Sequence, residues 1–175
     1  MKTKAPYFID FEASSLSFDS YPIEVAWSNS KDNIEAYLIS PQKISSWTDW
    51  SVESQKIHGI HRDELIQNGK DPQFVCERIY ATLDNQIVYS DASPFDMDWL
   101  KKLYEATNMP LPNFSIRDID ELCIAELACA DIGADSIVER LETLKIQAKN
   151  KVQKRHRATY DVEYLIELNH LCTCG

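Results

Sequence analysis

Two acidic residues stand two positions apart near the start of the chain, in the segment from Tyr7 to Glu12. The segment is β-prone, and side chains two residues apart in a strand point to the same face, so Asp10 and Glu12 would project together. Two carboxylates side by side in a buried segment resist ionisation unless a cation joins them. Mg²⁺ and Mn²⁺ prefer such oxygen ligands. The same spacing recurs at Asp161 and Glu163, so the pattern alone does not identify a metal site.

A further carboxylate, Asp96, stands in the middle of the chain, after a Ser-Pro-Phe sequence that begins at Ser93. Proline at the first helical position predicts that a helix begins here, with Asp96 in its first turn. An acid in a first turn favours the helix dipole, which is a sufficient structural reason for it. Asp91 and Asp98 are equally available acids, so the segment by itself does not single out Asp96.

Near the end of the chain, His156 precedes Asp161 in the pattern H-x-x-x-x-D. An imidazole just before a helix and a carboxylate in its first turns could converge, the acid holding a metal ion and the histidine taking a proton from water. The same pattern occurs at His58 and Asp63. We interpret the segment from His58 to Leu65 as a helix stop followed by a turn, where a histidine is structural or solvated.

The hydrophobic pattern predicts strands first and then alternating helices and strands. The expected strands cover about Tyr7–Phe11, Ile23–Ser28, Asn33–Ile39, Gln86–Ser90 and Phe114–Ile116. The expected helices are Ser51–Ile57, two helices opened by Asp71-Pro72 and Ser93-Pro94, one from Asp118, one from Asp135 to about Leu144 and one from Thr159 to Leu171. This order predicts an α/β domain with a mixed sheet.

The composition excludes several classes of protein. The 175 residues are 44% hydrophobic with a net charge of −10, which predicts an ordinary folded domain and argues against a protein that coats long nucleic acid. We expect no transmembrane helix, no signal peptide and, from five cysteines, a reduced cytoplasmic location. Cys172 and Cys174 are interpreted as part of a frayed tail. Glycine-rich phosphate loops, G-x-S-x-G and H-E-x-x-H do not occur.

The acidic motifs and the histidine occur in one order along the chain: Asp10-x-Glu12, then Phe95-Asp96, then His156-x-Ala158-x-x-Asp161. This order resembles that of the DEDD 3′–5′ exonuclease superfamily in its His-containing variant, the DEDDh or proofreading-exonuclease (DnaQ-like) family. Three further segments are similar to motifs of that family. Asp10–Leu16 resembles D-x-E-T-T-G-L, Ile23–Ala26 resembles I-I-E-I-G, and Ile57–Ile60 resembles H-G-I.

The resemblance implies a ribonuclease H-like fold, in which a five-stranded mixed β-sheet is flanked by α-helices, and a single 3′–5′ exonuclease domain over residues 1–175. It implies hydrolysis that releases 5′-mononucleotides from the 3′ end of single-stranded DNA or RNA. Two Mg²⁺ or Mn²⁺ ions about 4 Å apart would bind Asp10, Glu12, Asp96 and Asp161. His156 would accept the proton of the attacking water.

The resemblance also implies contacts with the substrate. Leu16 would wedge beside the terminal base, and the backbone from Glu12 through Ala13 to Ser14 would meet the terminal 3′-hydroxyl. Phe95 is a candidate for stacking on a base, although it is equally suited to the core. The chain departs from the family where Ala-Ser-Ser at positions 13–15 replaces Thr-Thr-Gly. It departs again where Asp91 stands near the place of an asparagine that often precedes Phe-Asp. Neither departure removes a metal carboxylate.

The basic residues of the C-terminal part are concentrated in one segment. All six lysine and arginine residues after residue 144 lie between Lys145 and Arg157, next to His156. A solvated loop could have this composition, but the placement also suits a grip on the phosphates of one strand end, with Lys154 and Arg155 as candidates. The overall acidity therefore favours an enzyme that holds a short single-stranded 3′ end over a protein that binds duplexes tightly.

Other functions remain open at this level. An oligoribonuclease-like enzyme would keep the fold and degrade very short RNAs. A non-catalytic subunit of a polymerase or repair complex would keep the fold without the activity, and an unrelated Mg²⁺-dependent phosphatase would make the motif order a coincidence. A homodimer is a further expectation from the family, and no membrane association is expected. Trp47 and Trp50 could serve the core, an interface or base stacking, and we favour the core.

Overall fold

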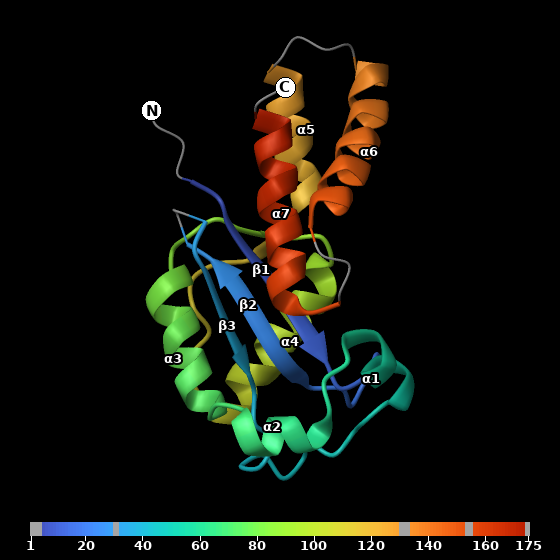
Figure 1. The fold of residues 1–175 in the computed structure, drawn as a ribbon. Coiled ribbons are helices and arrows are strands. Elements are labelled where there is room, and N and C mark those ends of the chain that lie inside the picture. Colours follow the sequence, from blue (N-terminus) through green and yellow to red (C-terminus); the bar gives the residue numbers. More distant parts are fainter. Residues whose placement is uncertain (1–4, 30–31, 130–133, 153–155, 174–175) are drawn as a thin grey trace.

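The computed structural model describes residues 5–29, 32–129, 134–152 and 156–173. Its strands are β1 (Tyr7–Ala13), β2 (Pro22–Ser28), β3 (Ile34–Leu38), β4 (Val88–Ser90) and β5 (Ile116–Asp118). They form one sheet in the order β3-β2-β1-β4-β5 (Figure 1). The first three strands pair antiparallel, whereas β4 pairs parallel with both β1 and β5. The predicted α/β fold with a five-stranded mixed sheet is confirmed.

Helices flank both faces of this sheet. The described residues form α1 (Val52–His58), α2 (Arg62–Asn68), α3 (Pro72–Leu83), α4 (Ser93–Thr107), α5 (Ile119–Cys129), α6 (Ala134–Lys151) and α7 (Ala158–Thr173). One core cluster joins the sheet to α3 and α4, and a second joins it to α5, α6 and α7. The last three helices pack side by side and rise together from one face of the sheet (Figure 1).

Alternation along β1 decides which side chains meet which helices. Ile9 and Phe11 belong to the core cluster with α3 and α4, whereas Phe8 belongs to the cluster with α5, α6 and α7. Since side chains two residues apart share a face, Asp10 and Glu12 point to the same side as Phe8. The strand therefore presents both acidic residues to α7.

Local signals explain where α1 and α3 begin. Ser51 Oγ and the Asp71 carboxylate each accept a backbone N–H from the first turn of the helix that follows, at 3.1 and 2.9 Å. Pro72 occupies the first turn of α3, as predicted. α1 ends at Gly59, whose φ of 71° lies in the left-handed region that glycine adopts without strain.

Three elements differ from the sequence prediction. Residues 62–68 form α2 where a turn was predicted, and the local start signal is weak because the His61 side chain makes no capping hydrogen bond. α6 extends to Lys151 instead of ending near Leu144, because its buried face continues through Ala148. β5 begins at Ile116, at the end of the predicted strand.

Trp47 and Trp50 both pack in or against the core of the protein. Trp47 is buried and stacks on Tyr21 with ring centroids 5.1 Å apart, so the core role favoured for it is confirmed. Trp50 packs against the same core and donates its Nε1–H to Gln55.

Cys172 is buried within α7, so its interpretation as part of a frayed tail is wrong, because the helix continues to Thr173. Cys174 lies outside the described residues.

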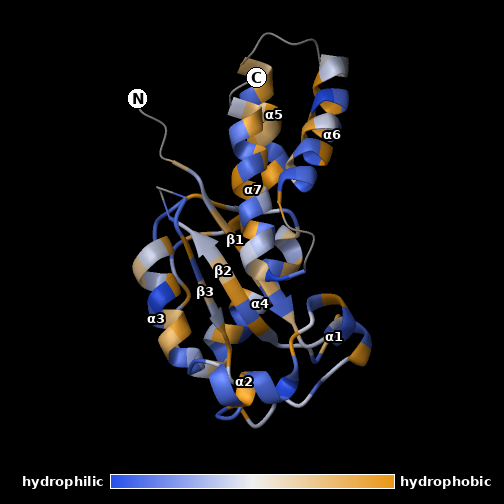
Figure 2. Ribbon diagram, in the orientation of Figure 1, coloured by the Kyte–Doolittle hydropathy of each residue, from blue (hydrophilic) through white to orange (hydrophobic). Residues whose placement is uncertain are grey.

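The hydropathy of the helices agrees with this packing. Figure 2 shows hydrophobic and hydrophilic residues interspersed along α3 and α6, as expected for helices with one buried face. Within the described ranges, none of the helices is both long and apolar enough to cross a membrane.

An ion pair joins the sheet to the start of α7. Glu24, on β2, is buried, and its carboxylate accepts hydrogen bonds from Arg157 Nε at 2.9 and 3.1 Å. It also accepts the backbone N–H of Ala158 at 3.0 Å, which is a donor without a partner inside the helix. A carboxylate at this end also favours the helix dipole. Glu24 therefore fixes the start of the helix that carries Asp161.

We expect the substitution Glu24→Ala to lower the free energy of unfolding by about 3 kcal/mol. Arg157 would lose its partner, and the first N–H of α7 would lose its acceptor. Urea unfolding followed by circular dichroism measures the change.

The matched control is Glu35→Ala on the neighbouring strand β3. Glu35 pairs with Arg78 at 2.8 Å, but both side chains are partly exposed, so its loss should cost no more than about 1 kcal/mol. Equal losses in the two variants would contradict an anchoring role for Glu24.

Candidate active site

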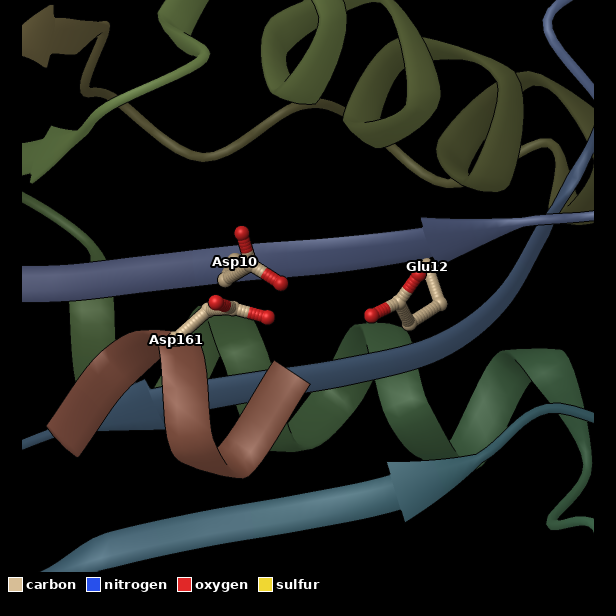
Figure 3. Close-up of side chains that lie close together, drawn as sticks. All are labelled: Asp10, Glu12 and Asp161. Atoms are coloured by element: carbon tan, nitrogen blue, oxygen red, sulfur yellow. The ribbon is translucent and has the colours of Figure 1, made fainter. Parts of the chain in front are cut away.

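Three acidic side chains meet between β1 and the first turn of α7. Asp10 and Glu12 project from the strand and Asp161 from the helix, and Figure 3 shows their carboxylates gathered in the space between the two elements. One oxygen of each carboxylate lies within 4.8 Å of the other two. Because hard divalent cations prefer carboxylate oxygens, this donor set fits such an ion.

Clustering and burial raise the pKa of all three carboxyl groups. Burial is the main cause for Asp10, and neighbouring carboxylates add to it, so its pKa lies well above the ordinary value. Burial and the charge of Asp161 raise the pKa of Glu12 to about 8. Burial and a neighbouring acid raise the pKa of Asp161 to about 6, although the charge of His156 acts in the opposite direction. A bound cation would relieve this repulsion, which is a second reason that the site fits one.

Asp96 lies beside this group of three. It is fully buried in the first turn of α4, where its Oδ1 accepts the N–H of Phe11 at 3.2 Å and its Oδ2 accepts the Ser90 hydroxyl at 2.5 Å. Burial raises the pKa of Asp96 to about 7. Its charge in turn raises the pKa of Asp10. Asp96 thus joins the start of α4 to β1, and its role as a metal ligand stays a prediction.

Asp91 adds another acidic group at this end of the sheet. It lies in the connection between β4 and α4, and its charge raises the pKa of Asp10, Asp96 and Asp161. In the sequence Asp91 stands out only as a departure from the family pattern. Its position directly after a buried strand was the signal available, because functional side chains gather on loops at strand ends.

His156 lies exposed just before α7, at a hollow of about 650 Å³. The hollow is also lined by His58, so the histidines of both H-x-x-x-x-D patterns meet there. The acids of the two patterns are separated, because Asp161 joins the carboxylate cluster whereas Asp63 is exposed on α2. The influence of His156 on the pKa of Asp161 places its charge near the cluster.

Of the two roles expected for His58, structural or solvated, the structure shows the structural one. Its side chain is buried, and its Nδ1 accepts the N–H of Ile60 at 3.0 Å. Nδ1 is therefore unprotonated, and the proton of the neutral ring lies on Nε2, which has no hydrogen-bond partner among the described residues. Burial lowers the pKa of His58 to about 4, so the ring is neutral at physiological pH. It is a neutral donor at the hollow that His156 also lines.

The segment that replaces Thr-Thr-Gly is held by hydrogen bonds. The register of β1 shifts between Glu12 and Ala13, which ends the regular strand. The hydroxyls of Ser14 and Ser15 both donate to Asp49, at 3.2 and 2.5 Å. Both serines are buried, so their hydroxyls are engaged within the protein. Asp49 was not identified from the sequence, because nothing near it marks a partner so distant along the chain.

The residues predicted to contact the substrate differ in their exposure. Leu16 is 79% exposed and Phe95 is 57% exposed, although Phe95 also contacts Trp99 with ring centroids 5.9 Å apart. Ala13 is 7% exposed, whereas Ser14 is wholly buried. The Ser14 N–H donates to the Tyr21 carbonyl and the Ser14 carbonyl accepts the N–H of Ser51, both at 2.9 Å, so the structure does not support the predicted contact of the Ser14 backbone with a 3′-hydroxyl. The predicted roles of Leu16, Phe95 and Ala13 stay open to experiment.

Most of the basic segment from Lys145 to Arg157 is engaged within the protein. Lys145 pairs with acidic residues of α5 and α6, and Lys151 pairs with one on α7. The Lys149 amine lies 5.6 Å from the centre of the Tyr164 ring, and Arg157 pairs with Glu24. The two predicted phosphate contacts, Lys154 and Arg155, lie outside the described residues.

Several solved structures have a fold similar to that of this chain. E. coli Exonuclease I in complex with a dT13 oligonucleotide has a TM-score of 0.69 and 18% identity, over 97% of this chain and 41% of that one. A moderately thermophilic Exonuclease I from Methylocaldum szegediense has a TM-score of 0.65 and 20% identity, over 97% and 40%. The zinc-bound E. coli enzyme with single-stranded DNA has a TM-score of 0.65 and 14% identity, over 98% and 40%. A comparison with curated proteins finds no significant match.

These likenesses establish a shared fold, and the chain spans about two fifths of the length of each matched structure. The sequence carries a stronger signal. The RNase T family model, described as "Exonuclease", matches residues 7–169, which include every described residue of the carboxylate cluster. This chain therefore belongs to the exonuclease family.

Proposed function

We propose that the chain is a metal-dependent 3′–5′ exonuclease of the His-containing DEDD type. It removes 5′-mononucleotides from the 3′ end of single-stranded nucleic acid, and its residues 1–175 act as one exonuclease domain. One observation carries this proposal: Asp10, Glu12 and Asp161 bring carboxylate oxygens within 4.8 Å of one another, and His156 directly precedes the helix that carries Asp161. The chemistry that such a site favours is phosphoryl transfer.

The substrate class rests on the fold and on the structures that share it. The matched Exonuclease I structures hold a dT13 oligonucleotide in one case and single-stranded DNA in another. The described part of the basic segment is engaged by internal partners, which argues against broad electrostatic binding of duplexes. Both considerations support a single-stranded 3′ end as the substrate.

Asp10, Glu12 and Asp161 would hold the divalent cation, Mg²⁺ or Mn²⁺, with Asp96 beside them for a second ion. Bound ions of this kind supply positive charge that lowers the pKa of a water molecule and offsets the charge of a phosphodiester. The carboxylates supply the negative charge that selects cations at this position. Asp96 also keeps the Phe11 backbone, and thus the adjacent Asp10, in place.

His156 accepts the proton of the water that attacks the terminal phosphodiester. The new bond joins the water oxygen to phosphorus, and the bond from phosphorus to the 3′-oxygen of the preceding nucleotide breaks. That oxygen takes a proton from solvent, so the products are a 5′-mononucleotide and a shortened strand with a 3′-hydroxyl. Arg157, which is anchored to Glu24, sets where the neighbouring His156 stands relative to α7.

Substrate contacts complete the proposal. Leu16 wedges beside the terminal base, Phe95 offers an aromatic face, and the backbone of Ala13 meets the terminal 3′-hydroxyl. The Ser14 backbone takes no part, because its N–H and carbonyl bond to Tyr21 and Ser51. The exposure of Leu16 and Phe95, which line one hollow, leaves both side chains accessible to a base. Lys154 and Arg155 contact phosphates of the strand; this assignment rests on the concentration of basic residues between Lys145 and Arg157.

The first test is a panel of labelled RNA and DNA single strands, from dinucleotides to long strands, incubated with and without EDTA. We expect stepwise shortening from the 3′ end in Mg²⁺ or Mn²⁺ and none in EDTA. Asp10→Asn and Asp161→Asn should each lower the rate about a thousandfold, since each removes several kcal/mol of metal-dependent stabilisation.

Asp63→Asn is the matched control for Asp161→Asn, because Asp63 ends the other H-x-x-x-x-D pattern but is exposed on α2. It should retain full activity. Unchanged activity in Asp161→Asn, or shortening that resists EDTA, would refute the proposal. Cleavage confined to the shortest RNAs would identify an oligoribonuclease-like enzyme, and no cleavage at all would favour a binding subunit.

We expect His156→Ala to lower kcat between about a hundredfold and ten thousandfold while Mn²⁺ binding stays intact, because the histidine transfers a proton and does not hold the ion. Single-turnover kinetics and calorimetry measure the two quantities separately. His170→Ala, an exposed histidine that pairs with Asp32, is the control and should leave both unchanged. Loss of Mn²⁺ binding in His156→Ala would show that the residue has a different role.

The affinity for Mn²⁺ should rise by at least about tenfold from pH 6 to pH 8, because protons compete with the ion for carboxylates whose pKa is raised. The relevant pKa values are about 8 for Glu12 and about 6 for Asp161. Titration calorimetry in matched buffers measures the affinity and the protons released. An affinity independent of pH over this range would contradict metal binding by these groups.

The raised pKa of Glu12 also determines how the stability of the metal-free protein changes with pH. The folded pKa of Glu12 lies above its ordinary value of 4.5, so the folded state holds this proton more tightly than the unfolded chain. The metal-free protein should therefore lose stability as pH rises from about 4.5 through about 8. Added Mn²⁺ should raise the melting temperature more at pH 8 than at pH 6.

A further inference from the structure

The connection between β1 and β2 carries the most exposed large apolar side chain in the described part of the protein. Phe18 is 93% exposed, and Leu16 on the same connection is 79% exposed. A side chain as large as phenylalanine leaves water when it has a partner. Sequence analysis gave no role to Phe18, and it lies beyond the segment that resembles the first family motif.

The connection is anchored on the side of α4. Lys102 donates hydrogen bonds to the carbonyl oxygens of Phe18 and Ser20, at 2.6 and 2.7 Å. The Trp99 indole donates to the Ser20 hydroxyl at 3.2 Å. The Lys102 amine also lies 5.6 Å from the centre of the Phe18 ring. Phe18 is therefore presented to solvent by a backbone that has internal hydrogen bonds.

The connection is anchored a second time on the side of the first motif. Ser15 Oγ accepts the N–H of Ser17 at 2.9 Å while it donates its proton to Asp49. Ser14 Oγ accepts the N–H of Tyr21 at 3.1 Å. Anchors at both ends mean that little conformational entropy is lost when a ligand meets Phe18, which favours binding.

A hollow of about 430 Å³ lies beside Phe18, within the range of small-ligand sites. Leu16, Phe95 and Trp99 give it apolar and aromatic walls. Its charged residues balance, since Lys101 pairs with Asp98 at 3.2 Å. Such walls suit a flat, uncharged ring better than a phosphate group.

Two residues that line the hollow are close in the chain to acidic residues of the proposed active site. Phe95 directly precedes Asp96, and Leu16 follows Glu12 closely on the same chain segment. If Leu16 stands beside the terminal base, the next base upstream lies on the other side of Leu16, and the hollow that Leu16 and Phe18 both line can receive it. This step rests on the function proposed above.

We propose that Phe18 stacks on the nucleobase of the penultimate nucleotide of a single-stranded substrate. The hollow between Phe18 and Phe95 receives this base, and every base is accepted because each has an aromatic face. The subsite makes the enzyme favour strands with a base at that position. Its contribution is to binding, so it lowers KM and leaves kcat unchanged.

The test is a cycle of two proteins and two substrates. Wild type and Phe18→Ala are each assayed on one single strand and on the same strand with an abasic residue at the penultimate position. On the complete strand, Phe18→Ala should raise KM about tenfold, as expected for one stacked base. On the abasic strand, wild type should show the same rise, and Phe18→Ala should add no more.

Two further variants sharpen the cycle. Phe18→Trp should restore the KM on the complete strand, because it restores an aromatic face. Tyr80→Ala, which removes an exposed aromatic side chain from α3, should change neither substrate. Circular dichroism of Phe18→Ala should match that of wild type, since the side chain is almost wholly in solvent.

Each contrary outcome has a definite meaning. A KM unchanged by Phe18→Ala, or raised equally on both strands, would overturn the stacking proposal while the exonuclease assignment stands. A wild-type dimer that dissociates in Phe18→Ala, seen by sedimentation, would identify a second copy as the true occupant of the hollow. Failure of the wild type to shorten either strand would overturn the proposed function and the stacking proposal with it.

Discussion

Electrostatic repulsion among buried carboxylates is the constraint that the rest of the structure must meet. Asp10, Glu12 and Asp161 hold oxygens within 4.8 Å of one another, and burial with mutual charge raises the pKa of each. Such a cluster persists only if the elements that carry it are fixed by other interactions. The ladder of β1 fixes two of the acids, and the pairing of Glu24 with Arg157 fixes the third through α7.

This arrangement concentrates negative charge at one end of the sheet, where bound cations would offset it. The described basic residues of the C-terminal segment pair with internal partners such as Asp120, Glu167 and Glu24. Arg157 lowers the pKa of Glu12, but burial and neighbouring acids outweigh this effect. The net charge of −10 is compatible with a nuclease that contacts its substrate over a small area.

The chain shares its fold with much longer nucleases at 14–20% identity, so the local chemistry of the site distinguishes it. Where the related motif has Thr-Thr-Gly, this chain has Ala-Ser-Ser, and Asp49 binds both serine hydroxyls. Hydrogen bonds here hold a connection whose exposed residues, Leu16 and Phe18, face solvent. A rigid apolar connection beside a charged centre is a combination suited to orienting the bases of a strand end.

The sequence predicted the alternation along residues 7–13 and the helix start at Asp71-Pro72, because each depends on neighbours a few positions apart. The order of the acidic motifs could also be seen in the sequence. The helix at 62–68 was not predicted because the His61 side chain makes no capping hydrogen bond at its start. The predicted length of α6 was too short because contacts with distant parts of the chain bury its last turns. Only the folded structure pairs Glu24 with Arg157, 133 positions away, or Asp49 with the serines. Such pairings arise when the sheet brings distant segments together, and local sequence carries no record of that distance.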